Sequence, residues 1–286
     1  MKALAIASNT FREAVRQPFY LLVLVIVVAL IGLHYFLPFF TLDATGEMQM
    51  FKDVCLSYIL FGLLVTALLL ASKVVDEEIE NRTTLTLMSK PVRRYQLILG
   101  KFVGVMAAVT LALIIYGVAL YVATRLRVPE EMRIDPQTTD EQEFEQLAAA
   151  LRMHSLSLLP AYALIWLQIA VMTAIGVAAS TRVGMVANLV IGIGIYVAGH
   201  LTAYLGVARG PLAKGLVVVL PFLENFNLND LIIYKDLVFS GAAPGPGQVA
   251  YSHVWALVGL AGLYALGYVA VALTAALALF RTRELG

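Results

Sequence analysis

The stretch FYLLVLVIVVALIGLHYFLPFF, residues 19–40, decides the fold class, because it contains no Lys, Arg, Asp or Glu. It is longer than the roughly 20 apolar residues that a helix needs to cross a hydrocarbon core about 30 Å thick. It is also too long for the apolar region of a signal peptide, and no small-residue cleavage site follows it. We therefore expect a retained membrane-spanning helix.

Five further apolar stretches follow it, at residues 54–75, 102–123, 158–180, 183–207 and 254–280. The chain of 286 residues is 60% hydrophobic and 14% charged, about half of the roughly 25% charged residues usual in soluble domains. A soluble globule could not cover so much apolar surface, and a net charge of +1 offers no basic face for nucleic acid. The sequence predicts an all-α polytopic membrane protein with six transmembrane helices in one domain, residues 1–286.

The distribution of Lys and Arg predicts the orientation. With a cytoplasmic N-terminus, the inner segments hold twelve of these residues and the outer loops eight. The outer loops, 124–157 and 209–252, are also much longer. The number of Lys and Arg per residue therefore differs between the two sides more than the counts alone show. We expect both termini in the cytoplasm.

Residues 1–17 have an amphipathic pattern, with Leu4, Ala7 and Phe11 near helical spacing and Arg12 and Arg16 away from them. Such a segment can lie in the membrane interface and lead into the first span. The alternative is a frayed basic N-terminus.

The loop KVVDEEIENRTTLTLMSKPVRRYQLILGK, residues 73–101, is the richest in charge. Its acidic residues come first and its basic residues last, an order that suits the dipole of a short helix over 76–88. Pro91 then ends this helix. A helix of this kind can dock on a cytosolic partner; the alternative is a solvated loop that only enforces orientation.

The outer loops carry weaker signals. Acidic residues and helical spacing predict an external amphipathic helix over 140–153, with its acids as a solvated face. Between 209 and 252, two short apolar pieces, 216–222 and 231–239, flank the polar run ENFNLND. We expect re-entrant or interfacial helices there, before the sixth span.

The sequence lacks its own energy source. No predicted span carries an acidic residue in its middle, which disfavours an ion-coupled carrier. Gly100 and Lys101 are followed by Phe102 rather than Ser or Thr, and Tyr95 replaces the first glycine of a phosphate-binding loop. Hydrolase motifs are also missing. We expect a non-catalytic chain, with ATP hydrolysed elsewhere if it is used.

Polar residues at depth suggest packing rather than chemistry. Gln168 and Asn188 are the main ones, and we expect interhelical hydrogen bonds from them. The single cysteine, Cys55, excludes an intramolecular disulfide. The histidines all map to the outer half, and imidazole suits copper, but they lack tight ligand spacing, so we expect no metal site. These histidines are His34, His154, His200 and His253.

Small residues predict close helix contacts. Gly100 and Gly104 form a G-x-x-x-G pattern at the start of the third span, and Gly192 and Gly194 are small residues within the fifth span. Either close approach of helices within the chain or self-association would use them.

The segment EIENRTTLTLMSKPVRRYQLILGKFVG, residues 78–104, resembles the first cytoplasmic loop of type-2 ATP-binding-cassette (ABC) permeases. Arg82 stands where many members carry glycine. The overall look is also similar to the permeases of copper-enzyme maturation, such as the nitrous-oxide reductase assembly permease, with LPFLENFNL (residues 220–228) as a further cue. The residues that match the loop pattern are Glu78, Glu80, Thr83, Leu85, Leu87, Ser89, Pro91, Arg94, Gly100 and Lys101.

The resemblance implies a multi-pass permease of a prokaryotic inner membrane. It would pair with a second permease copy or a related permease, among membrane lipids, and with a separate ATPase that binds ATP and Mg. The loop would couple to that ATPase, Glu78, Glu80 and Arg82 through polar contacts and Leu87 and Met88 by packing. The full set of implied coupling residues is Glu78, Glu80, Arg82, Thr83, Leu87, Met88, Pro91 and Arg94.

Two other functions stay open at this point. One is a non-transport membrane scaffold for maturing an extracytoplasmic enzyme, which would bind an external partner and no ATPase. The other is a membrane-embedded enzyme, which would need polar groups converging near one membrane face. The substrate and the direction of transport do not follow from the sequence.

Overall fold

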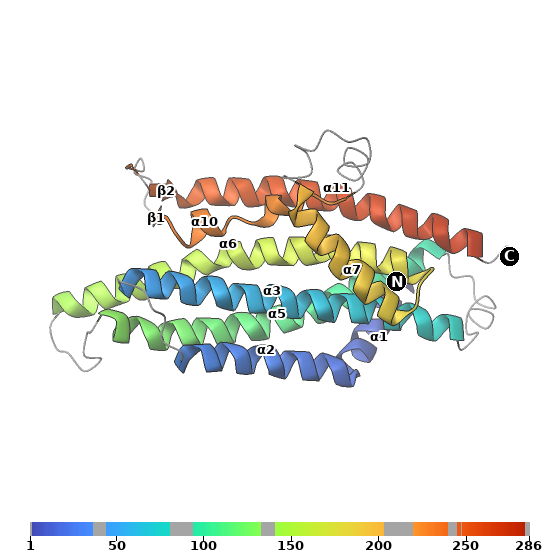
Figure 1. The fold of residues 1–286 in the computed structure, drawn as a ribbon, viewed down its shortest axis with the longest axis horizontal. Coiled ribbons are helices and arrows are strands. Elements are labelled where there is room, and N and C mark those ends of the chain that lie inside the picture. Colours follow the sequence, from blue (N-terminus) through green and yellow to red (C-terminus); the bar gives the residue numbers. More distant parts are fainter. Residues whose placement is uncertain are drawn as a thin grey trace.

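The long helices pack against one another and run along the long axis of the molecule (Figure 1). The computed structural model describes residues 2–36, 44–80, 94–132, 141–202, 220–239, 245–246 and 248–283. The five helices are each long and apolar enough to cross a membrane. They are α2 (Pro18–Phe36), α3 (Ala44–Glu80), α5 (Arg94–Met132), α6 (Glu141–Ser180) and α11 (Tyr251–Arg283).

The expected fifth span is shorter than the others. Helix α7 (Met185–His200) has 16 residues, about 24 Å at 1.5 Å per residue, and it runs obliquely to the long helices in Figure 1. It ends at His200 rather than at 207, with Leu201 as its C-cap. The described chain therefore holds five helices of spanning length and one shorter apolar helix.

Both chain ends lie toward the same end of the bundle in Figure 1, here named the terminal end. It holds α1 (Lys2–Arg16), the end of α3, the start of α5 and the turn between α6 and α7. The other end, here named the opposite end, holds the starts of α3, α6 and α11. The helix expected over residues 1–17 is thus present as α1, and it packs against α5.

Parts of two short helices expected from the sequence are extensions of long ones. Residues 141–153 are the beginning of α6, and residues 76–80 of the helix expected over 76–88 are the end of α3, while residues 81–88 lie outside the described residues. No glycine or proline lies between Asp140 and Pro160, or between Gly62 and Pro91. With no residue to break the backbone ladder, the helices continue beyond the apolar segments.

Helix α6 passes through Pro160 without ending. Proline has no N–H, so the carbonyl of Leu156, four residues earlier, loses its partner inside the helix. The hydroxyl of Tyr251, at the start of α11, donates a hydrogen bond to that carbonyl at 3.1 Å. The helix tolerates the proline because a neighbouring helix satisfies the freed group.

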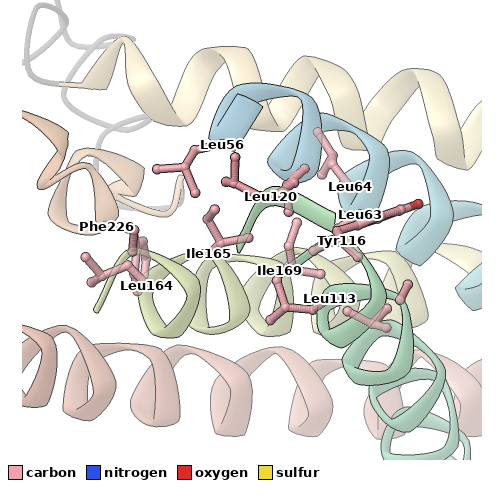
Figure 2. Packing of buried hydrophobic residues seen from close by; sticks show 14 of the residues in the cluster. Leu56, Leu63, Leu64, Leu113, Tyr116, Leu120, Leu164, Ile165, Ile169 and Phe226 are labelled. Carbon is pink, nitrogen blue, oxygen red and sulfur yellow. The ribbon is translucent and has the colours of Figure 1, made fainter. Parts of the chain in front are cut away.

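Helices α3 and α6 form the centre of the bundle. The most apolar windows of these two helices are 61% and 67% buried, against 22% for α2 and 17% for α11. Figure 2 shows side chains of α3, α5 and α6 meeting in the core, with Phe226 at one edge. The labelled core residues are Leu56, Leu63, Leu64, Leu113, Tyr116, Leu120, Leu164, Ile165 and Ile169.

The segment before α11 is built differently from the expectation. It contains the 3-10 helix η1 (Leu223–Phe226) and the four-residue helix α10 (Asn229–Ile232). Strand β1 (Asp236–Val238) then pairs in parallel with β2 (Gln248–Ala250), with Asp236 opposite Gln248. Short helices are thus present before α11, but a helix over the whole of 231–239 is wrong, because the chain leaves the helical conformation after Ile232 and Asp236–Val238 pair with β2. Most of the other expected piece, 216–222, lies outside the described residues.

Candidate functional site

Three of the eight predicted coupling residues lie in described helices, at the terminal end of the bundle. Glu78 and Glu80 are in the last turns of α3, and Arg94 is the first residue of α5. The other five, Arg82, Thr83, Leu87, Met88 and Pro91, lie outside the described residues. The two helices that flank this loop are thus placed, and the contacts of its side chains are not.

Gly100 and Gly104 lie where α1 crosses the start of α5. A Cβ atom added to Gly104 would come within 2.7 Å of the backbone oxygen of Ala7, and one added to Gly100 within 2.9 Å of that of Ala3. Thr10 of α1 is 3% exposed in this contact. Only glycine allows two helix backbones to approach so closely.

Gly192 and Gly194 have different surroundings. A Cβ atom on Gly192 would lie 2.5 Å from a methyl carbon of Leu68 on α3. The absence of a side chain at Gly192 therefore leaves room for Leu68. Gly194 has nothing within 4 Å of the corresponding position and is exposed. It makes no close contact with any helix in the described part of the chain.

Asn188 joins three helices near the terminal end. Its amide nitrogen donates to the hydroxyl of Ser72 on α3 at 2.5 Å and to the carbonyl of Gly176 on α6 at 3.2 Å. Asn188 and Ser72 are both fully buried. The interhelical hydrogen bond expected of Asn188 is confirmed.

A polar cavity of about 350 Å³ lies between α3, α6, α7 and the η1–α10 segment. Apolar side chains from α3, α6 and η1 form part of its wall. Its polar lining residues are Asp53, Ser57, Gln168, Tyr196, His200, Asn227, Asn229, Asp230 and Tyr234.

Asp53 of α3 fastens the η1–α10 segment over the cavity. One carboxylate oxygen accepts a hydrogen bond from the amide of Asn229 at 2.7 Å, and the other accepts one from the hydroxyl of Tyr234 at 3.2 Å. Burial, and then the negative charge of Asp53, raises the pKa of Tyr234. The phenol therefore stays protonated at neutral pH and remains a donor.

Gln168 and His200 form a second polar pair on the cavity wall. The ring nitrogen Nδ1 of His200 lies 3.0 Å from the carbonyl oxygen of Tyr196, which can only accept, so Nδ1 carries the proton. The other ring nitrogen, Nε2, lies 3.3 Å from the amide nitrogen of Gln168 and accepts from it when the ring carries a single proton. The hydrogen bond expected of Gln168 is confirmed, and its other amide atom, Oε1, is left to face the cavity.

Other charged side chains at the opposite end make their own pairs. Arg127 of α5 donates to the carboxylate of Glu47 at 2.6 Å, and Lys52 lies 2.6 Å from the ring of His154. None of these four residues lines the cavity. Within the described ranges, no three His, Cys, Asp or Glu side chains are grouped to hold a metal ion.

Sequence reasoning missed the cavity because it began the second span at Val54. Helix α3 begins ten residues earlier, at Ala44, so Asp53 lies inside α3. The polar run ENFNLND supplies Asn227, Asn229 and Asp230 to the same cavity. The signal that could have found it was this run together with an acidic residue at the edge of an apolar stretch.

The model of the ABC-2 family of transporter proteins matches residues 4–285. The chain belongs to the ABC-2 transporter family. No curated protein matches it.

Membership of the ABC-2 family agrees with the several membrane-spanning helices of the chain. The chain is a multi-pass membrane protein of the permease kind, in a family whose membrane subunits are generally non-catalytic and typically work with an ABC ATPase. The family match gives no support to the narrower resemblance to copper-enzyme maturation permeases.

Proposed function

We propose that this chain is the membrane-spanning permease subunit of an ABC transporter whose energy comes from ATP and Mg bound on a separate ATPase. The observation that carries the proposal is the course of α3. The same 37-residue helix lines the cavity with Asp53 and ends at Glu80, where the loop that resembles the ATPase contact begins. These two residues are about 40 Å apart along the helix axis at 1.5 Å per residue.

A continuous, well-packed helix can transmit a displacement from one end to the other. When the ATPase pair closes on ATP, the loop after Glu80 would shift and α3 would move as one body. Asn188 joins α3 to α6 and α7 through Ser72 and Gly176. Movement of α3 would therefore also change the walls that α6 and α7 give to the cavity.

The coupling roles rest on the loop's resemblance to the ATPase-contacting loop of type-2 ABC permeases, and the order of its charges supports them. In this proposal Glu78, Glu80 and Arg82 make polar contacts with the ATPase, and Leu87 and Met88 pack into its groove. A second permease copy, or a related permease, completes the membrane part in a lipid bilayer, taken here as a prokaryotic inner membrane.

A pull-down tests the proposal. The tagged protein is expressed with its neighbouring reading frames, purified in mild detergent, and its co-purifying chains are identified by mass. We expect a soluble ATPase with a phosphate-binding loop, and we expect Glu80→Lys to lose it. Glu224→Lys, at an exposed carboxylate of η1, is the matched control and should keep it.

Two outcomes would contradict the proposal. Retention of the ATPase by the Glu80→Lys protein, with unchanged ATP hydrolysis by the complex, would remove the loop from the contact. Recovery of an extracytoplasmic protein and no ATPase would instead favour a scaffold for enzyme maturation.

A further inference from the structure

The cavity between α3, α6, α7 and η1–α10 has two aspartates in its lining and, among the parts of the chain that the structure describes, one histidine but no Lys or Arg. Asp53 and Asp230 both contribute carboxylates to it. Neither is paired with a described Lys, Arg or His side chain; Asp53 is held only by the amide of Asn229 and the hydroxyl of Tyr234. A carboxylate with two neutral donors keeps lone pairs for a cation.

A second observation points to a ligand. Gln168 is 3% exposed and lines the cavity, and among the described residues its Oε1 accepts no hydrogen bond. This oxygen is not among the closed-off polar atoms of the described chain, so it is open to the cavity, where water or a solute can donate to it. Because the Gln168 nitrogen is held by His200, this oxygen presents an acceptor rather than a donor to the cavity.

Part of the remaining wall is apolar. Leu56 and Leu60 of α3 and Leu164 and Ile165 of α6 contribute it. The volume of about 350 Å³ falls at the small end of the range of roughly 300–1,000 Å³ found for ligand pockets. Acceptors separated by apolar side chains suit a short aliphatic solute with hydrogen-bond donors.

We propose that this cavity is a binding site for a small organic ammonium ion, a protonated aliphatic amine that carries a second hydrogen-bond donor. Asp53, with Asp230, supplies the counter-charge, and Gln168 Oε1 accepts from a donor group. The proposal of a binding site rests on the cavity and its lining residues alone. That its ligand is the transported solute rests on the proposed function.

A purely structural role for Asp53 is the alternative that the experiment must separate. In that case Asp53 only fastens α10 through Asn229 and Tyr234. Asp53→Asn keeps the shape and an acceptor oxygen but removes the charge. Asp230→Asn provides a second variant, because Asp230 is exposed and makes no described side-chain hydrogen bond, so we expect this substitution to leave the fold unchanged.

The experiment is calorimetric titration of the full-length protein in nanodiscs of phosphatidylcholine, without nucleotide or ATPase. The probes are putrescine, 1,4-butanediol and succinate, which share a four-carbon chain and differ in charge. We expect putrescine to bind at least about tenfold more tightly than the other two, since only the diamine gains from the carboxylates. Asp53→Asn should weaken putrescine by about tenfold and Asp230→Asn by about threefold, because Asp230 is exposed and screened. Glu224→Gln, an exposed carboxylate outside the cavity lining, is the matched control and should change nothing.

Several results would overturn the proposal. They are equal binding of 1,4-butanediol or succinate, absence of putrescine binding, and unchanged putrescine affinity in both aspartate variants. Because the titration contains no ATPase, these results leave the proposed coupling to an ATPase untouched. Equally, a failed pull-down of the ATPase leaves the binding result standing.

An ammonium group can come from a free amine or from a lipid headgroup. The titration is therefore repeated in nanodiscs that contain phosphatidylethanolamine. A fall in apparent putrescine affinity would identify the headgroup as the occupant of the same site, and an unchanged affinity would identify a free solute.

Discussion

Two serines on α3, Ser72 near the terminal end and Ser57 near the opposite end, make the same local hydrogen bond in very different places. Each hydroxyl donates to the carbonyl four residues earlier, at 2.8 Å for Ser72 and 2.9 Å for Ser57. Ser72 is fully buried and also accepts from Asn188, whereas Ser57 is exposed on the cavity wall.

The difference lies in the neighbours of α3 rather than in α3 itself. Near Ser72, Gly176 and Gly192 let α6 and α7 approach the helix closely. Near Ser57, the short helix α7 ends at His200, and the irregular η1–α10 segment takes its place. The terminal end is therefore closely packed, and the opposite end is hollow and polar.

The largest effect is expected from filling a glycine at the packed end. Gly104→Val should lower the free energy of unfolding by about 3 kcal/mol, because its Cβ would meet the backbone of α1 and neither helix can yield. Unfolding in mixed micelles measures this. Gly194→Val is the matched control and should change stability by less than about 0.5 kcal/mol, since nothing lies near that position. Equal losses in the two variants would mean that α1 does not depend on this contact.

The next largest effect is expected at Asn188, whose buried amide hydrogen-bonds to α3 and α6. Asn188→Leu removes the donor to both Ser72 and Gly176 and should cost about 1–2 kcal/mol. A double-mutant cycle with Ser72→Ala isolates the Asn188–Ser72 hydrogen bond. Ser57→Ala, the equivalent change in the hollow region, should cost less than about 0.5 kcal/mol. Similar losses for Ser72→Ala and Ser57→Ala would remove the contrast between the two ends.

A smaller effect is expected where α11 satisfies α6. Tyr251→Phe leaves the Leu156 carbonyl without its donor and should cost about 1 kcal/mol. In a Pro160→Ala background the helix supplies its own N–H, so the same change should then cost almost nothing. A cost that is independent of residue 160 would show that the hydroxyl acts in some other way.

The smallest effect concerns Tyr234 and alkaline pH. Its raised pKa means that the folded protein favours the neutral phenol. The resulting stability is present below the ordinary tyrosine pKa of about 10 and is lost as the pH rises through the folded pKa. A difference absorbance titration between wild type and Tyr234→Phe should show a midpoint above about 10, and Asp53→Asn should lower it. A midpoint at the ordinary value would mean that Asp53 does not act on the phenol.

The long helices could be predicted from the sequence because their apolar runs have few equivalents in a soluble fold. The glycines at 100, 104 and 192 also gave a usable signal for close contact, although their partners, α1 and Leu68, did not follow from it. Which neighbour a glycine receives depends on how the helices are arranged in space, and local spacing carries no information on that.

Helix ends and the cavity could not be predicted in the same way. An apolar window marks where a helix crosses lipid, but a helix continues into water as long as nothing interrupts its hydrogen bonds, as α3 and α6 do. The cavity combines Asp53 with residues such as Asn229, 176 positions later along the chain. Only the tertiary fold brings these together.

The hydrogen bond from Tyr251 to Leu156 has a consequence for the order in which the chain is made. Translation proceeds from the N-terminus, so α6 enters the membrane with the Leu156 carbonyl still without a donor. The missing donor arrives only with the first residue of α11, which is synthesised well after α6. A ribosome-bound chain that stops before Tyr251 therefore carries an incompletely satisfied α6, and α11 completes the backbone hydrogen bonding of a helix inserted much earlier.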